Sequence, residues 1–245
     1  MKTRIEIHIL TYNEHIMLPF TIAHYRRMFG NPTFIIHDNN STDDTAEYAM
    51  MEGCTVIPFS TEGMNDTIQA QIKSANAYMP VTDTDWVLCI DADEECLINS
   101  KDLDDLDAAG INAVEFQGWN IFDNVKSPWD IKDPMGVPCS GYSKPVLLKT
   151  GVFDHITFAA GAHSVILTPK EGNEVKWSKD KYKLLHYKHW SCDWNIGRSA
   201  ELAARQSEDN KAKKHSFHFA FAKDVHESYF NANFAQRILI TDERL

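Results

Sequence analysis

Asp85-Trp86-Val87-Leu88-Cys89-Ile90-Asp91-Ala92-Asp93-Glu94-Glu95 is the stretch of sequence that decides the fold. The apolar run predicts a buried strand over residues 86–90, and this strand ends abruptly in carboxylates. Because side chains alternate between the two faces of a strand, Asp91 and Asp93 can both project from the carboxyl edge of a sheet, where open α/β folds bind ligands. Carboxylates in this pattern are typical of a divalent cation held against a phosphorylated ligand.

Three shorter apolar segments precede this strand, at residues 5–10, 33–37 and 55–59, and helix-like stretches lie between them. This alternation is typical of β-α-β units in a parallel sheet. The first helix is expected to begin near Pro19 and to end at Gly30, because proline is tolerated at a first helical position and glycine suits a helix terminus. The sequence therefore predicts an α/β fold with a mostly parallel central sheet flanked by helices.

The pattern of apolar and polar residues changes near Ala113. Residues 114–122 alternate apolar and polar side chains, and prolines and glycines interrupt the stretch that follows. One helix is expected over residues 194–214, with further helical cover over 217–240. We expect one domain over residues 1–245, with a second half that is more irregular than the first.

Composition limits the possible function classes. A chain of 245 residues with 43% hydrophobic content can bury a substantial core. The net charge of -11 argues against broad nucleic-acid binding, which needs clustered lysine and arginine. No run of roughly 20 apolar residues predicts a membrane span, and the amino terminus alternates like a strand, so a cytoplasmic location is expected. The five cysteines are scattered without a C-x-x-C pair, which indicates reduced thiols.

Two polar clusters follow the first and second predicted strands, at residues 11–14 and 38–45. Both should lie at the same sheet edge as Asp91. A turn followed by a helix start would explain the second cluster equally well, because asparagine and aspartate favour turns and serine, threonine and aspartate cap helices. Asp38 differs, because a carboxylate at the end of a buried parallel strand is well placed to accept hydrogen bonds from a base or ribose hydroxyl.

The motifs Thr-Tyr-Asn-Glu, Asp-Asn-Asn-Ser-Thr-Asp-Asp-Thr and Asp-Ala-Asp-Glu-Glu each follow a predicted strand. In this order and spacing they resemble the nucleotide-sugar-binding half of family 2-type glycosyltransferases with the GT-A fold. The resemblance covers about the first hundred residues. It implies a nucleotide-sugar donor, with UDP-sugar favoured, a glycan, lipid-linked or small-molecule hydroxyl acceptor, and Mn²⁺ or Mg²⁺ as cofactor. It also implies a donor half over residues 1–110 and an acceptor half with carboxyl-terminal helices over residues 111–245.

The resemblance carries roles for individual residues. It assigns nucleoside contacts to Thr11, Asn13, Glu14, Asp38 and Asn40, with Ser41 more marginal. Asp91 would lie near the ribose or a metal-bound water, and Asp93 would ligate the ion. An acidic solvated turn is the alternative for residues 91–95, but clustered like charges after an apolar strand are unfavourable without a cation. Lys73, on the helix before this strand, is a further candidate donor contact or a solvated lysine.

The segment Leu184-Leu185-His186-Tyr187-Lys188-His189-Trp190 resembles the late strand that ends in a metal-binding histidine in some GT-A enzymes. His186 is the preferred metal ligand, because a neutral imidazole can complete the coordination of an ion, and Lys188 would lie near the diphosphate. An ordinary packed histidine is the alternative. His163 is the substitute ligand, because its small neighbours allow close approach of a ligand.

An inverting enzyme needs a carboxylate to deprotonate the acceptor hydroxyl on the face opposite the leaving diphosphate. Residues 150–155 resemble the Gly-x-Phe-Asp-Glu segment of many family 2 enzymes, which nominates Asp154 as the catalytic residue, although His155 replaces the second acid. A turn or cap is the alternative role for Asp154, and the other candidate bases are Asp123, Asp130 and Asp133. The sequence does not distinguish inversion from retention. A D-x-D phosphatase or phosphotransferase and a non-catalytic carbohydrate-binding module are the rival functions.

Overall fold

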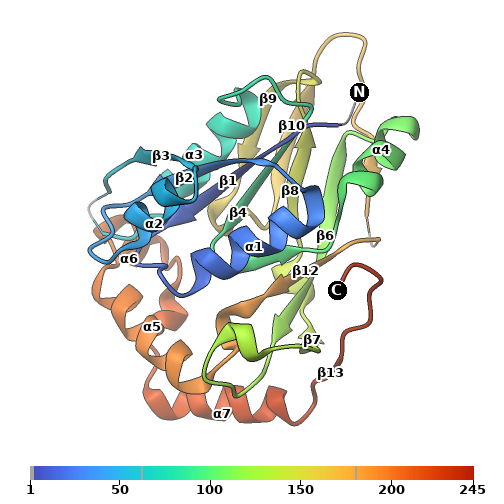
Figure 1. Ribbon diagram of the computed structural model, residues 1–245. Helices are drawn as coiled ribbons and strands as arrows, with labels where there is room; N and C mark the ends of the chain where they lie inside the picture. Colours follow the sequence, from blue (N-terminus) through green and yellow to red (C-terminus); the bar gives the residue numbers. More distant parts are fainter. Residues whose placement is uncertain (1–2, 62, 180) are drawn as a thin grey trace.

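The computed structural model describes residues 3–61, 63–179 and 181–245. Its central sheet has the strand order β13-β7-β6-β8-β4-β1-β2-β3 (Figure 1). The parallel part consists of β1 (Ile5–Thr11), β2 (Thr33–Asp38), β3 (Thr55–Pro58) and β4 (Trp86–Asp91). Each of the four strands ends within one residue of the predicted boundary. The predicted α/β class is confirmed.

Helices connect these parallel strands: α1 (Met17–Phe29), α2 (Thr45–Met51) and α3 (Asp66–Tyr78). A further helix, α4 (Ser100–Ala108), precedes the later strands. Helix α1 ends as predicted at Gly30, whose φ of 77° favours a residue without a side chain. Its Ile22 and Tyr25 side chains are buried in the main core. This packing fixes the ends of β1 and β4 relative to each other.

The sheet continues without a break into the second half of the chain. The later strands are β5 (Glu94–Cys96), β6 (Ala113–Ile121), β7 (Met135–Pro138), β8 (Lys144–Lys149), β11 (Trp177–Ser178) and β12 (Lys183–His186). Strand β8 runs antiparallel between β4 and β6, and β12 pairs with both β5 and β6. A separate hairpin of β9 (Phe153–Phe158) and β10 (Val165–Pro169) packs beside α3. Short 3-10 turns lie at η1 (Pro128–Asp130), η2 (Ser140–Tyr142), η3 (Ala160–Ala162) and η4 (Tyr187–His189).

The prediction of one helix over residues 194–214 is wrong. Two helices, α5 (Cys192–Ala204) and α6 (Glu208–Lys213), are separated by residues 205–207. The break occurs because Ser207 donates its backbone N–H to Met64 and caps α6 with its side chain. Residues 217–240 are only partly helical, with η5 (Phe217–Ala220), α7 (Lys223–Phe234) and the short strand β13 (Ile238–Leu239).

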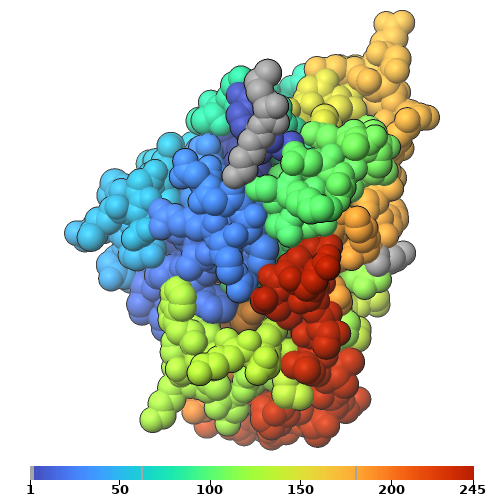
Figure 2. Space-filling model, turned by 45° about the vertical axis from the view of Figure 1, so that its right-hand side comes forward, coloured from blue at the N-terminus to red at the C-terminus, as the bar shows by residue number. Residues whose placement is uncertain are grey.

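The carboxyl-terminal residues lie across the face shown in Figure 2, between α4 and the segment that leads into β7. The Ile240 N–H donates to the Pro134 carbonyl over 3.0 Å. Arg244 Nε donates to Asp102 Oδ2 over 2.8 Å, which ties the end of the chain to α4. Among the described helices, none combines the length and the apolar character that a membrane crossing requires.

Candidate active site

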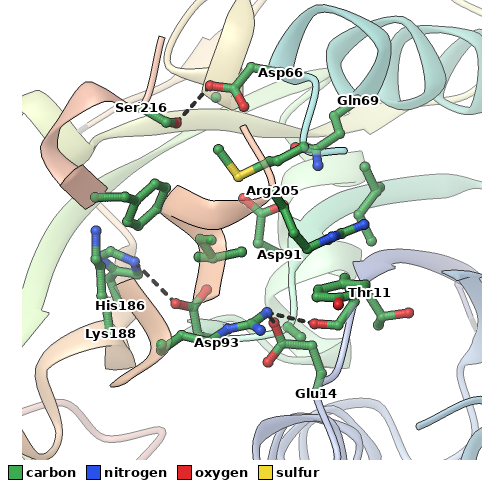
Figure 3. A pocket seen from close by; sticks show the side chains of 18 of the residues that line it. Thr11, Glu14, Asp66, Gln69, Asp91, Asp93, His186, Lys188, Arg205 and Ser216 are labelled. Atoms are coloured by element: carbon green, nitrogen blue, oxygen red, sulfur yellow. Dashed lines mark hydrogen bonds and ion pairs between the residues drawn. The ribbon is translucent and has the colours of Figure 1, made fainter. Parts of the chain in front are cut away.

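A pocket of about 210 Å³ opens where β1 and β4 end, and the α5–η5 region covers it (Figure 3). The residues that line it include Thr11, Tyr12, Glu14, Phe59, Asp66, Asp91, Asp93, Tyr142, Lys144, His163, His186, Lys188, Arg198, Arg205, His218 and Phe219. The described parts of both halves of the chain therefore contribute to one pocket. Of the predicted site residues, the pocket lining includes Thr11, Glu14, Asp91, Asp93, His186 and Lys188.

The two D-x-D carboxylates reach the pocket from different local structures. Asp91 is the last residue of β4, whereas Asp93 lies in the turn that joins β4 to β5. Thr21 holds this turn by donating its hydroxyl to the Ala92 carbonyl over 2.5 Å. The alternation of a continuous strand is therefore not what orients Asp93. The tight turn brings both carboxylates to the sheet edge.

His186 ends β12 and faces Asp93. Its Nε2 atom lies 3.4 Å from Asp93 Oδ2, as the dashed line in Figure 3 marks. The Nδ1 atom lies 2.9 Å from Asn120 Oδ1, an acceptor, so Nδ1 carries the proton and donates to it. The Nε2 atom is then the ring nitrogen that points toward Asp93. The Tyr142 ring stacks on the imidazole with centroids 3.6 Å apart, and this stacking fixes the plane of the ring.

Two lysines neutralise Asp91. Lys73 Nζ lies 2.8 Å from Oδ1 and Lys144 Nζ lies 3.1 Å from Oδ2. Burial alone would raise the pKa of Asp91, but the two lysines lower it well below its usual value. The expectation that the acidic cluster needs a bound cation is therefore wrong for Asp91. The protein itself supplies two cations, Lys73 and Lys144, from distant parts of the sequence.

Glu94 and Glu95 are buried in β5 and do not form a solvated turn. Glu94 binds the ammonium of Lys144 and accepts a hydrogen bond from the Tyr142 hydroxyl over 2.9 Å. Glu95 Oε2 lies 3.2 Å from His24 Nδ1. Burial raises the pKa of Glu95 to about 8 and lowers the pKa of His24 to about 3. Both groups are therefore mostly neutral at pH 7, and they meet as a hydrogen-bonded pair rather than as an ion pair.

The end of the pocket beside Tyr12 and Glu14 is covered by two arginines of the α5 region. The guanidinium carbon of Arg205 lies 3.1 Å from the centroid of the Tyr12 ring. Arg198 donates to the Tyr12 carbonyl over 2.6 Å and pairs with Glu14. Burial raises the pKa of Glu14 to about 7, although the positive charge of Arg198 opposes this shift. Neither arginine was predicted, because a helix that begins near residue 192 gives no sequence signal for contact with residue 12.

Three of the predicted nucleoside contacts lie outside the pocket lining. Asn13 and Asn40 have left-handed backbone, with φ of 52° and 56°, and their side chains hold turns. Asp38 is buried and accepts hydrogen bonds from Ser41, including one from its N–H over 3.1 Å. At Asp38 and Asn40 the structure favours the turn role that the sequence left open for the second cluster.

Of the remaining predicted site residues, Lys188 lines the pocket, whereas Lys73 and Asp154 do not. Lys73 is buried outside the pocket lining and reaches the pocket only through its ion pair with Asp91. Asp154 is an exposed residue of β9 outside the lining. Lys188 lines the pocket and lies 2.8 Å from His218 Nε2. Burial lowers the pKa of Lys188 to about 8, although the charge of Asp93 opposes the shift.

A second acidic cluster lies away from the pocket. His15, Asp43 and Asp44 form, among the described residues, the one group of three potential metal ligands whose ligand atoms lie within 4.8 Å of one another. Asp43 accepts hydrogen bonds from Thr45 and from the His15 backbone, so its oxygens are already used in a turn. This cluster has a structural explanation and is not a candidate for donor binding.

Hydrogen bonds, called the latch below, hold the α5–α6 connection against the loop before α3. The Met64 N–H donates to the Arg205 carbonyl over 2.6 Å, and the Ser207 N–H donates to the Met64 carbonyl over 3.1 Å. Asn210 then bonds both the backbone N–H and the carboxylate of Asp66. These contacts hold the residues that cover the pocket against the start of α3.

The Gly63→Ala variant tests this latch. A Cβ at Gly63 would lie 2.0 Å from the Arg205 carbonyl oxygen, and φ is +83°. Gly53→Ala is the matched control, because Gly53 has φ of +76° and nothing within 4 Å of the added atom. The control should lose only about 1–2 kcal/mol, the cost of left-handed backbone. Urea unfolding should show a larger loss of unfolding free energy for Gly63→Ala. Equal losses in the two variants would show that the latch can shift to accommodate the added Cβ without cost.

A family model matches the first part of the chain. The model of glycosyl transferase family 2 matches residues 6–101, which include the three strand-end motifs. These residues are therefore similar to family 2 glycosyltransferases. The matched region supplies β1 to β4 and the D-x-D turn, while β12 and the α5–η5 region lie beyond it. None of the curated proteins matches the chain.

Solved structures of other proteins are similar at low identity. A structure of S. aureus TarS 1-349 is 14% identical over 94% of this chain and 74% of that one, with a TM-score of 0.45. Another S. aureus TarS structure is 13% identical, with a TM-score of 0.45, and this chain spans 93% of its own length and 43% of that chain. Glucosyl-3-phosphoglycerate synthase from Mycobacterium tuberculosis, in complex with Mn²⁺, UDP and glucosyl-3-phosphoglycerate, is 19% identical over 48% of this chain and 44% of that one, with a TM-score of 0.33.

Proposed function

We propose that this glycosyltransferase moves a sugar from a nucleoside-diphosphate sugar, UDP-linked by preference, to a hydroxyl acceptor with the help of Mn²⁺ or Mg²⁺. The observation that carries the proposal is the facing pair of Asp93 and His186 in the pocket, with ligand atoms 3.4 Å apart. An octahedral ion with ligands at about 2.1 Å places neighbouring ligands roughly 3 Å apart, so the pair fits such an ion. Asn120 holds His186 in the tautomer that a metal ligand needs.

The pocket residues have distinct roles in this proposal. The bound ion would stabilise the negative charge of the departing diphosphate. Lys188, which projects into the same pocket, contributes a further positive charge to that diphosphate. Thr11 and Tyr12 hold the nucleoside, so a base that stacks on Tyr12 must displace or pack against the Arg205 guanidinium. Lys73 and Lys144 keep Asp91 ionised, which suits it to accept a hydrogen bond from a ribose hydroxyl or a metal-bound water.

Nucleotide binding is the direct test. Thermal unfolding is measured with UDP, GDP and dTDP, each with and without MnCl₂. A ligand present at about 100 times its Kd stabilises the native state by about 2.7 kcal/mol, so UDP with Mn²⁺ should raise Tm by about 5–10 °C. UDP alone should raise it much less. If none of the three nucleotides shifts Tm at saturating Mn²⁺, the donor proposal is wrong.

A D-x-D phosphatase would use Asp91 as its nucleophile, and the structure gives an argument against that function. Both Asp91 oxygens are in ion pairs with lysines, which stabilise the carboxylate and weaken it as a nucleophile toward a phosphoryl group. Incubation with a phosphomonoester should therefore release no phosphate. Phosphate release together with an acyl-phosphate on Asp91 would favour the phosphatase. A non-catalytic carbohydrate-binding module would not explain Mn²⁺-dependent nucleotide binding.

A further inference from the structure

The loop between β9 and β10 presents one imidazole to the pocket. Gly161 and Ala162 both have left-handed backbone, with φ of 71° and 57°. Left-handed backbone is costly for alanine, and such residues cluster at functional sites. The Ala159 N–H closes the loop by donating to the Ser164 carbonyl over 3.0 Å. A Cβ at Gly161 would lie 2.8 Å from Nε2 of His163, so the glycine allows the ring to fold over the backbone.

The His163 ring lies next to the predicted metal ligands without contacting them. The His163 ring contacts the Tyr142 ring edge-to-face, with centroids 5.2 Å apart. The Tyr142 ring in turn stacks on the His186 ring. His163 is thus one aromatic ring away from the position proposed for the ion. The residue is exposed, and among the described residues neither ring nitrogen has a hydrogen-bond partner. It can therefore meet a molecule that enters from solvent.

The other candidate bases in the pocket already have partners. Asp66 accepts hydrogen bonds from Asn210 and Ser216, one on each oxygen. Asp91 is held by two lysines, and Glu14 pairs with Arg198 at the nucleoside end. The acids that the sequence nominated, Asp154, Asp123, Asp130 and Asp133, are absent from the described pocket lining.

We propose that His163 is the catalytic base that takes the proton from the acceptor hydroxyl; this inference rests on the proposed function. The acceptor O–H proton moves to a ring nitrogen of His163 as the acceptor oxygen forms a bond to the anomeric carbon. The bond from that carbon to the diphosphate oxygen breaks, and its electron pair leaves with the nucleoside diphosphate. A single displacement of this kind inverts the anomeric configuration.

The charges around the ring are compatible with this role. Partial burial and the positive charge of Lys144 lower the pKa of His163 to about 4, with smaller contributions from Lys73 and His186, whereas Asp91 opposes the shift. The imidazole is therefore neutral at pH 7 and able to accept a proton. The basicity of His163 in the free enzyme is therefore similar to that of an ordinary carboxylate, such as the Asp154 side chain that the family resemblance nominated.

The test compares two identical substitutions in one hairpin, His163→Gln and His155→Gln. His155 is an exposed residue of β9 that contacts Thr157 and lies outside the pocket lining. UDP-glucose and MnCl₂ are supplied with water as the acceptor, and UDP release is measured. His163→Gln should lower kcat by about 10²- to 10⁴-fold, the usual contribution of a general base. The Kd for UDP with Mn²⁺ should stay within about threefold of wild type, and His155→Gln should leave both values unchanged.

Two further readouts distinguish catalysis from folding. The released glucose should have the β configuration when first formed from the α-linked donor. In the wild type, kcat/KM should rise with pH through about 4, the pKa of His163, and this limb should be missing in His163→Gln. Retention of configuration, a loss below threefold in His163→Gln, or a large loss in Asp154→Asn would overturn the proposal. Nucleotide binding without any detectable hydrolysis by the wild type would also count against it, whereas absence of nucleotide binding would contradict the donor proposal instead.

Discussion

Asp93→Asn should remove both glycosyl transfer and the Mn²⁺-dependent part of nucleotide binding. The amide keeps the size of the side chain but loses the negative charge that a hard cation prefers. The charge of Asp93 is favoured in the native state, because interaction with His186 lowers its pKa although burial alone would raise it. We expect kcat/KM to fall by at least 10²- to 10³-fold, roughly the effect of removing one preorganised electrostatic group from an active site.

The measurement for Asp93→Asn pairs a rate assay with the thermal shift produced by UDP and Mn²⁺. Asp44→Asn is the matched control, because Asp44 is an exposed acid in the second strand-end motif whose side chain makes no cap hydrogen bond. It should retain the wild-type rate and thermal shift. If Asp93→Asn kept a Mn²⁺-dependent shift of wild-type size, the ion would have to be held elsewhere, and the pairing of Asp93 with His186 would be only structural.

The parallel part of the fold could be predicted because its signals are local. Each buried parallel strand is a short apolar run that ends in turn-forming polar residues, and this pattern located β1 to β4 within one residue at each end. The sheet edge then follows from the topology, since the carboxyl ends of parallel strands meet. This reasoning brought Asp91 and Asp93 to one pocket before any contact was known.

The surroundings of these carboxylates depend on contacts between distant parts of the sequence. The charge balance of residues 91–95 alone cannot include Lys73 from α3 or Lys144 from β8, which lie far away in the sequence. In the same way, the break between α5 and α6 is set by hydrogen bonds to Met64, more than 140 positions away. Helical periodicity carries no information on such contacts, and for the same reason it could not place Arg198 and Arg205 over Tyr12.

Lys144→Met should cause the largest loss of stability among these variants. Lys144 is 1% exposed, and its ammonium bridges Asp91 and Glu94, which is 0% exposed. Methionine fills a similar volume but leaves Glu94 buried with only the Tyr142 hydroxyl as a side-chain donor. Breaking a buried ion pair from one side typically costs about 3–5 kcal/mol, because an uncompensated charge stays in the interior. Urea unfolding should report a loss in this range.

Lys149→Met is the matched control for Lys144→Met, because it removes a lysine from the other end of the same strand. Lys149 pairs with Asp107, but its side chain is 32% exposed, so water can replace the lost partner. Surface pairs of this kind contribute about 1 kcal/mol or less. Adding Glu94→Gln to Lys144→Met should recover part of the stability, since the double variant buries no unpaired carboxylate there. Equal losses for the two lysine variants would instead mean that Lys144 contributes no more to stability than a surface lysine does, and Asp91 would then depend on Lys73 for most of its charge compensation.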